Sequence, residues 1–223
     1  MLKREYILTL FGKKMNSRDQ AEKFWDRTAD NYDKEEKKDE KTYLNIIEKT
    51  RKYLKVSDVV LDFGCGTGLV SNEIAGNVKT VHAIDTSSKM VEIAKNKAMG
   101  RKIKNIDYAY STIFDDKYKK GSFNVILAFY VLHLLDDSQK VIQRMNELLK
   151  PGGLIISVTP CMGEKPVLNS IFSIVSKIGI IPEIRPFKFP ELEHLLTKEN
   201  LEIVETKCLH KRSKQYFFVA RKH

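Results

Sequence analysis

The stretch VVLDFGCGTG, Val59 to Gly68, decides the fold of this chain. A β-branched, apolar run reaches Asp62, and three glycines then alternate with larger residues before a helix-like segment begins. This order is typical of a buried parallel strand that ends in a tight turn. Glycine is needed where the backbone must come close to a ligand, because a Cβ would collide with it. We therefore expect a ligand site at the glycines, which begin at Gly64 and Gly66.

A second acid, Asp85, ends the next apolar run, VKTVHAID, which begins at Val78. An acid at the tip of a second strand is well placed to hold the two hydroxyls of a ribose. The glycine spacing is not the dinucleotide pattern G-x-G-x-x-G, because Leu69 stands where its third glycine would be. No Gly-Lys-Ser/Thr follows, as it would in a phosphate-binding P-loop. The sequence predicts a nucleoside-cofactor site.

Length and composition limit the class of protein. A chain of 223 residues, 42% of them hydrophobic, fits a single domain covering residues 1–223 with a real core. No apolar run reaches the roughly 18 residues needed to cross a bilayer, and the apolar stretch near the N-terminus is too short for a signal peptide. We expect a cytoplasmic protein. The three cysteines lack metal-ligand spacing, which predicts reduced thiols and no metal site.

The formal net charge is +10, which is compatible with binding to nucleic acid or to another anionic partner. The basic residues are spread along the chain, however, and no basic run is interleaved with aromatic residues. This distribution favours a role in solubility over a dedicated nucleic-acid face. Nucleic acid stays open as a less favoured partner, and the pattern does not reveal the oligomeric state.

Strands alternate with helices over most of the chain, which predicts a parallel sheet covered by helices on both faces. The expected class is α/β, a three-layer, Rossmann-like, doubly wound sheet that is mostly parallel, with an antiparallel C-terminal hairpin. Residues 17–54 form an N-terminal helical cap, and residues 160–190 form a substrate lid insertion. The expected strands are 58–63, 78–84, 106–110, 122–130, 154–160, 201–209 and 215–221. The expected helices are 17–31, 36–54, 69–75, 88–98, 136–149, 167–178 and 191–198.

With these segments placed, the chain resembles the class I S-adenosylmethionine-dependent methyltransferases over roughly Phe24 to Lys222. LDFGCGTG resembles the family's first motif, and AIDTSSKMVEIAK resembles its second. GSFNVILAFYVLHLL resembles the fourth-strand motif, and LLKPGGLIIS resembles the turn into the fifth strand. FWDRTADNYDKE resembles an N-terminal segment common in methyltransferases that act on small molecules.

The resemblance implies S-adenosyl-L-methionine as cofactor and S-adenosyl-L-homocysteine as its product. Asp85 would hold the ribose hydroxyls, and Tyr32 would lie over the cofactor. Many relatives carry Gly-Asp where this chain has Ser111-Thr112, so adenine binding would depend more on backbone contacts here. The implied cofactor-binding residues are Tyr32, Asp62, Gly64, Cys65, Gly66, Asp85, Thr86, Met90, Ser111, Thr112, Ile113 and Phe129.

Methyl transfer from a sulfonium is an in-line displacement, and it needs a general base only when the nucleophile arrives protonated. His133, after the fourth strand, is the candidate base, although a histidine packed under a loop is the alternative. Tyr32 is the second catalytic candidate, because it would cover the methyl group or orient the nucleophile. The candidate substrate residues lie beyond the ends of strands four and five. They are Tyr130, Cys161 and Arg185.

The leading hypothesis is an S-adenosylmethionine-dependent methyltransferase that acts on an O, N or carboxylate nucleophile of a small molecule or short peptide. An RNA (tRNA) methyltransferase is the first alternative, motivated by the net charge. The stretch AFYVLH, where base N-methyltransferases have Asn/Asp-Pro-Pro-Tyr/Phe, argues against it. The second alternative is a non-catalytic, cofactor-binding scaffold on the same fold. The intact glycine motif and Asp85 argue against the scaffold.

Overall fold

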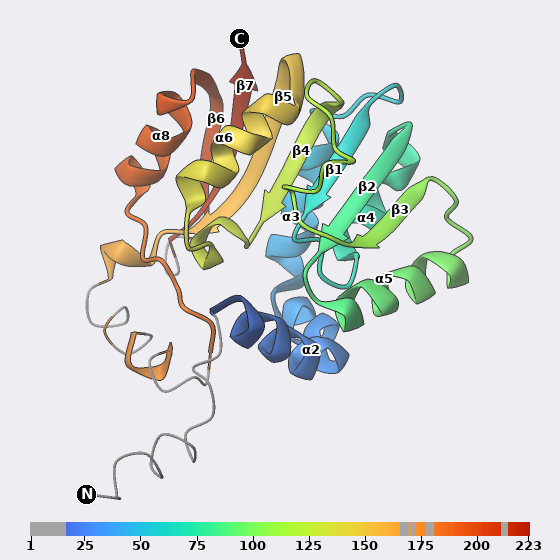
Figure 1. Ribbon diagram of the computed structural model, residues 1–223, viewed down its shortest axis with the longest axis horizontal. Helices are drawn as coiled ribbons and strands as arrows, with labels where there is room; N and C mark the ends of the chain where they lie inside the picture. Colours follow the sequence, from blue (N-terminus) through green and yellow to red (C-terminus); the bar gives the residue numbers. More distant parts are fainter. Residues whose placement is uncertain (1–16, 166–169, 171–172, 177–180, 211–213) are drawn as a thin grey trace, which may run out of the picture.

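The computed structural model describes residues 17–165, 170, 173–176, 181–210 and 214–223. Its centre is a single sheet of seven strands in the order β3-β2-β1-β4-β5-β7-β6, with helices on both faces (Figure 1). The strands are β1 (Val59–Phe63), β2 (Thr80–Asp85), β3 (Ile106–Tyr110), β4 (Phe123–Phe129), β5 (Leu149–Pro160), β6 (Leu201–His210) and β7 (Gln215–Lys222). The α-helices are α2 (Ser17–Glu36), α3 (Glu40–Arg51), α4 (Leu69–Ile74), α5 (Ser88–Gly100), α6 (Ser138–Leu148) and α8 (Phe189–Lys198).

The pairing of the strands confirms the predicted mixed, doubly wound sheet. β1 lies between β2 and β4 and runs parallel to both. β7 runs antiparallel to β5 and to β6, as the predicted C-terminal hairpin requires. The chain leaves β1 toward β2 and later returns to the other side of β1 with β4, so the winding direction reverses there. In sheets of this kind, ligands bind beyond the carboxyl ends of the strands at such a reversal.

Two hydrophobic cores cover the two faces of the sheet. Successive side chains of a strand point to opposite faces, so Leu61 of β1 packs with α6 and α8 while Val60 packs with α3, α4 and α5. The same alternation continues in β7, where Phe218 faces the first core and Phe217 the second. Both faces of the central strands are therefore buried, which explains why β1 and β4 are almost continuously apolar.

The N-terminal helices differ from their predicted boundaries. α2 continues to Glu36 instead of ending at residue 31, and η1 (Lys37–Asp39) then separates it from α3. The break occurs at Asp39, whose carboxylate accepts a hydrogen bond from the backbone N–H of Thr42 and so caps α3. α2 crosses below the ends of the strands, where it covers the predicted ligand site (Figure 1).

The remaining boundaries agree within a few residues, except that β5 begins at Leu149 rather than at residue 154. The predicted helix over 167–178 falls mainly on residues outside the described part of the chain. The division into a helical cap at 17–54 and a lid at 160–190 stays a prediction. Within the described ranges, no helix is long and apolar enough to cross a membrane.

Candidate functional site

The glycine turn after β1 lies directly against the end of β2. The backbone N–H groups of Gly64 and Cys65 both donate to the carbonyl oxygen of Ile84, at 2.9 and 3.0 Å. Gly64 and Gly66 have φ values of 73° and 53°, in the left-handed region that favours glycine. The turn therefore brings bare backbone to the carboxyl edge of the sheet.

Asp85 connects this turn to the start of α5. One carboxylate oxygen accepts from the backbone N–H of Gly66 at 2.8 Å, and the other accepts from the N–H of Ser87 at 2.9 Å. Burial raises the pKa of Asp85, and the hydrogen bonds from backbone N–H groups act in the opposite direction. Since each carboxylate oxygen has two lone pairs, the group can still accept hydrogen bonds from a ligand.

A cavity of about 150 Å³, here called the Asp85 cavity, lies between the strand ends and α2. It brings together eight of the predicted cofactor residues with the substrate candidate Tyr130. The apolar wall that α2 and the segment after β4 contribute to this cavity was not predicted from the sequence. The predicted residues that line it are Tyr32, Gly64, Gly66, Asp85, Thr86, Met90, Ser111, Phe129 and Tyr130. The additional lining residues are Ala21, Trp25, Phe63, Ile84, Val131, Leu134 and Leu135.

A second cavity of about 340 Å³, here called the Glu36 cavity, adjoins the first. Tyr32, Gly64, Phe129 and Tyr130 line both cavities, so a ligand group in one can approach a group in the other. The predicted residues Asp62 and Cys65 line only the second of the two. The other residues that line the Glu36 cavity are Glu35, Glu36, Asp39, Thr42, Tyr43, Ile46, Leu69, Val70 and Gln215.

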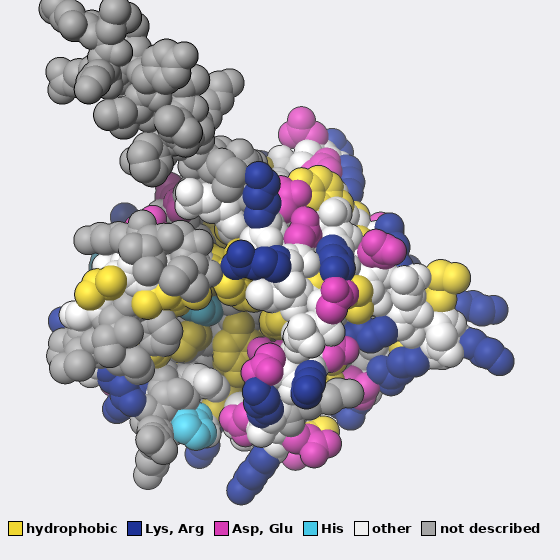
Figure 2. Space-filling view, turned by 90° about the horizontal axis from the view of Figure 1, so that it is seen from below, with side chains coloured by type: hydrophobic (Ala, Val, Ile, Leu, Met, Phe, Trp, Pro, Cys, Tyr) yellow, Lys and Arg dark blue, Asp and Glu magenta, His cyan; other side chains and the backbone are white. Residues whose placement is uncertain are grey.

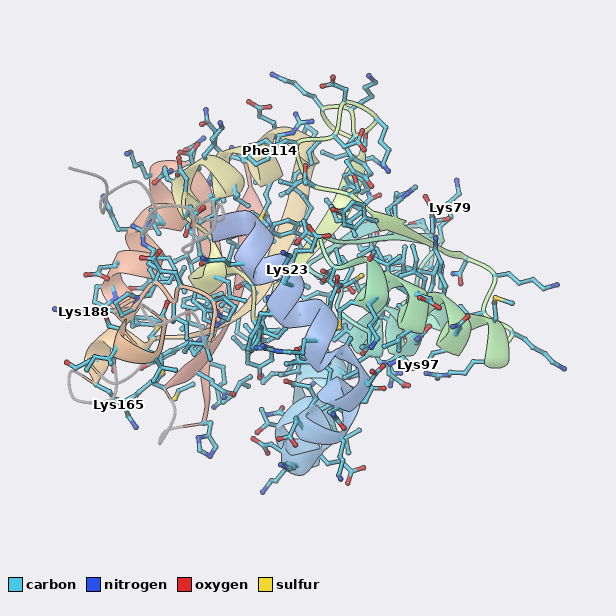
Figure 3. The ribbon with its side chains drawn as sticks, turned by 60° about the horizontal axis from the view of Figure 1, so that its bottom comes forward. Lys23, Lys79, Lys97, Phe114, Lys165 and Lys188 are labelled. Atoms are coloured by element: carbon cyan, nitrogen blue, oxygen red, sulfur yellow. The ribbon has the colours of Figure 1, made fainter. Side chains whose placement is uncertain are left out.

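Three aspartates on one face of α2 hold this helix over the site. Asp26 accepts hydrogen bonds from the Ser87 hydroxyl and, at 3.3 Å, from the backbone N–H of Lys89. Asp30 pairs with Lys89, and Asp33 accepts from Lys97 at 2.7 Å. Figure 3 shows α2 crossing the molecule, with Lys97 labelled where α5 approaches it. The spacing of these acids is visible in the sequence, but their partners on α5 are not.

Comparisons with known proteins agree with this geometry. A family model described as a methyltransferase domain matches residues 54–214, which is most of the chain. The ubiquinone biosynthesis O-methyltransferase of Rickettsia canadensis is 30% identical over 171 residues, covering 74% of this chain and 72% of the relative. The chain belongs to the class I S-adenosylmethionine-dependent methyltransferase family.

Other relatives of this chain match over shorter stretches. The ubiquinone biosynthesis O-methyltransferase of Coxiella burnetii is 30% identical over 124 residues, covering 56% of this chain and 53% of the relative. The chain thus spans about half the length of this curated relative. A solved SAM-dependent methyltransferase from Methanosarcina mazei has 20% identity and a TM-score of 0.64, covering 78% of this chain and 96% of the other. This similarity supports the fold.

Several predicted site residues line neither cavity. Ile113 is buried in the first core, and the Thr112 hydroxyl accepts from the backbone N–H of Phe114 at 3.3 Å. Cys161 is fully buried in the same core, where burial raises its pKa to about 12. The Arg185 guanidinium lies 5.0 Å from the centre of the Phe187 ring. In the described part of the chain, no cluster of three or more His, Cys, Asp or Glu side chains could hold a metal.

His133 is buried and also lines neither cavity. Its carbonyl oxygen accepts from the backbone N–H of Arg185 at 2.7 Å. Its Nδ1 atom has no hydrogen-bond partner among the described residues. Burial lowers the pKa of His133 to about 4, so the imidazole is neutral at neutral pH. Its catalytic role stays a prediction. That role implies that His133→Ala lowers turnover more than it lowers cofactor affinity.

Replacing His133 with leucine should make the protein less sensitive to acid. The folded-state pKa lies below the unfolded value near 6.5, so the histidine's contribution to stability is present above pH 6.5 and is lost as the pH falls toward 4. Between pH 8 and pH 5 the variant should lose about 2 kcal/mol less unfolding free energy than the wild type. Urea denaturation at both pH values measures this difference. The exposed His194→Leu variant is the control, and equal losses in all three proteins would contradict the prediction.

Asp62, at the end of β1, is a buried acid with one short contact, to the Ser71 hydroxyl. Burial raises its pKa to about 6, whereas the hydrogen bond from Ser71 acts in the opposite direction. The negative charge of Asp85 adds to the increase. The ionised carboxylate at neutral pH therefore destabilises the empty protein.

Asp62→Asn should stabilise the empty protein at pH 8. An acid with a raised folded-state pKa contributes stability below its unfolded pKa near 4 and loses it as the pH rises through about 6. The asparagine does not titrate, and its oxygen can still accept from Ser71. The difference in unfolding free energy between variant and wild type should therefore grow by about 2–3 kcal/mol from pH 4 to pH 8. Urea denaturation measures it, with the exposed Asp116→Asn as control. A difference independent of pH would refute the prediction.

Proposed function

We propose that this protein transfers a methyl group from S-adenosylmethionine to a nucleophile of a small molecule. The observation that carries the proposal is the Asp85 carboxylate, held at the tip of β2 by the glycine turn and directed into an apolar cavity. A carboxylate in this position suits the two hydroxyls of a ribose. Met90 and the aromatic wall suit an adenine ring.

The space above Gly66 also fits the cofactor. A Cβ added to Gly66 would lie 3.7 Å from the Cε1 atom of the Tyr32 ring, an ordinary contact distance, and so would occupy the space between the turn and the covering ring. Bare backbone at Gly66 leaves this space free for the ligand. We propose that Tyr32, Gly64 and Gly66 enclose the sulfonium end of the cofactor, and that Asp62 and Cys65 border its amino-acid end.

S-adenosylmethionine, when bound, supplies an activated methyl group. The protein's contribution is position and the exclusion of water. Tyr32 covers the turn from α2, while Phe129 and Tyr130 close the site from the end of β4. Tyr130 has φ 54°, an uncommon conformation for a bulky residue, and strained residues of this kind cluster at functional sites. A nucleophile entering through the Glu36 cavity would meet these shared residues.

The size of the Glu36 cavity and the relatives support a small acceptor. A volume of about 340 Å³ is in the range of small-molecule sites. Two relatives are named as ubiquinone biosynthesis O-methyltransferases, and the enzyme from Lactococcus lactis as a demethylmenaquinone methyltransferase. Those names describe small-molecule acceptors of those proteins.

Isothermal titration with S-adenosylhomocysteine tests the proposal. We expect a dissociation constant in the micromolar range or below, and no heat with NAD as the control nucleotide. Binding of neither compound would contradict the cofactor assignment and would favour a scaffold role. Binding of NAD alone would show that the site serves a different cofactor.

A further inference from the structure

The Asp85 cavity is too small to hold a complete cofactor. Sites that enclose a ligand of this size have volumes of about 300–1,000 Å³, whereas this cavity has about 150 Å³. The adjoining Glu36 cavity adds about 340 Å³, and Gly64 lines both. A cofactor whose ribose binds at Asp85 would therefore extend past Gly64 and place its amino-acid end in the Glu36 cavity, where Asp62 and Cys65 lie.

The charge inside the Glu36 cavity is opposite to that of the whole chain. The chain carries a net charge of +10, yet none of the described residues that line this cavity is Lys, Arg or His. Seen from the end of the molecule that α2 covers, acidic and basic side chains are interspersed across the surface (Figure 2). The uniform sign of the charges in the cavity is therefore a local property. The acids that line it are Glu35, Glu36, Asp39 and Asp62.

Two of these acids, Glu36 and Asp62, have carboxylate oxygens without a hydrogen-bond partner among the described residues. Asp62 is only 3% exposed, and one of its two oxygens contacts the Ser71 hydroxyl. Glu36 is partly buried and makes no hydrogen bond or ion pair with any residue that the structure describes. Burial and the nearby charges of Asp33 and Asp39 raise its pKa. A desolvated carboxylate of this kind is stabilised by a cation brought to it.

Aromatic rings border the same carboxylate. Tyr32 and Tyr130 line both cavities. Burial raises the pKa of each tyrosine, and the negative charge of Glu36 raises it further, which places the carboxylate near both rings. Aromatic rings attract cations through their negative faces, so rings beside a carboxylate favour an ammonium group over an anion.

We propose that the Glu36 cavity recognises the cofactor through its ammonium group alone, with Glu36 as the ion-pair partner. The site therefore also takes adenosyl thioethers and sulfoniums whose side chain carries an amine but no carboxylate. This inference rests on the proposed function, because it needs the adenosine part in the Asp85 cavity. The four-carbon side chain of the cofactor fills only part of the cavity's volume of about 340 Å³, which leaves room for an acceptor.

The two charged groups of the amino-acid end meet different surroundings in this cavity. The ammonium meets carboxylates, whereas the cofactor's carboxylate loses hydration among acids of the same sign. The described lining offers that carboxylate neutral donors, such as the Thr42 hydroxyl, but no positively charged side chain. Removing the amine from the cofactor should therefore cost more affinity than removing the carboxylate.

Two analogues of S-adenosylhomocysteine test this difference, one decarboxylated and one deaminated. Isothermal titration should show the decarboxylated analogue binding about tenfold or more tightly than the deaminated one. The net charge of +10 favours the anionic, deaminated analogue, so the opposite preference reports the cavity and not the whole chain.

Two results of these titrations would overturn the inference while leaving the proposed function intact. The first is a deaminated analogue that binds as tightly as the decarboxylated one, or more tightly. The second is binding of neither analogue by a protein that binds S-adenosylhomocysteine. Failure of S-adenosylhomocysteine itself to bind would instead contradict the proposed function.

Two matched variants assign the preference to Glu36. Glu36→Gln should lower the affinity for the decarboxylated analogue about fivefold or more and should not lower the affinity for the deaminated one. Glu48→Gln removes the same charge from an exposed position on α3 outside the cavity, and should change neither. Equal effects of the two variants would refute a specific contact with the ammonium. Loss of both analogues in Glu36→Gln alone would show a structural role for this acid, which would also overturn the inference.

Discussion

Asp85→Ala should lower the affinity for S-adenosylhomocysteine at least 100-fold while the protein stays folded. The variant loses the carboxylate that would accept from two ribose hydroxyls, and hydrogen bonds to a charged group contribute about 1.5–3 kcal/mol each. It also releases the N–H of Gly66, which Asp85 holds at 2.8 Å, so the glycine turn loses its support. Isothermal titration measures the affinity, and thermal unfolding monitored by circular dichroism verifies the fold.

The control for this variant is Asp116→Ala, which removes an exposed carboxylate outside both cavities. Its affinity should equal that of the wild type. Unchanged affinity in Asp85→Ala would remove the cofactor assignment. A variant that unfolds below room temperature would be replaced by Asp85→Asn, which keeps the shape but directs an amide N–H at a backbone donor. That variant should still lose about tenfold in affinity.

Gly68→Ala should lower the free energy of unfolding by about 2–5 kcal/mol. Gly68 begins α4 with φ 74°, a conformation that costs an L-residue about 1–2 kcal/mol. A Cβ there would lie 2.3 Å from the Tyr108 hydroxyl oxygen and 3.0 Å from the Cβ of Ala94, in the packed second core. Relief of such a clash in a dense core costs a further 1–3 kcal/mol or so. Urea denaturation measures the total.

Gly152 provides a control with the same backbone conformation. Its φ is 73°, and no atom lies within 4 Å of an added Cβ, so Gly152→Ala should lose only about 1–2 kcal/mol. Adding Tyr108→Phe to Gly68→Ala removes the closest atom and should recover part of the loss. Equal destabilisation in the two alanine variants would show that backbone conformation, and not the contact with Tyr108, makes glycine necessary at position 68.

The sequence predicted the sheet because local patterns are enough to specify its parts. A β-branched run followed by glycines identifies the end of β1, and a second acid identifies the end of β2. The predicted C-terminal boundary of α2 was wrong because no residue in 31–36 breaks a helix. α2 ends at Glu36 and η1 follows, up to Asp39, whose side chain caps α3 through a single contact.

For the candidate site, the sequence predicted residues from their positions at the ends of strands. Asp85 and Tyr130 line cavities because they end β2 and follow β4. Cys161 also follows a strand, but the packing of α8 and β7 buries it in the first core. Whether a residue after a strand faces a ligand or a neighbouring helix depends on contacts between distant segments. Motif order cannot supply those contacts.

The sequence by itself determined the α/β sheet, the glycine turn and the acid opposite it, because each depends on residues close together in the chain. Only the tertiary structure decided that α2 contacts α5 through the helix face that carries Asp26, Asp30 and Asp33. That docking places Glu36 beside Tyr130, almost a hundred residues away in the sequence, and encloses an acidic cavity in a basic protein. The physical reason is that a cavity's charge is set by the side chains that folding brings together, whereas composition reports only their sum.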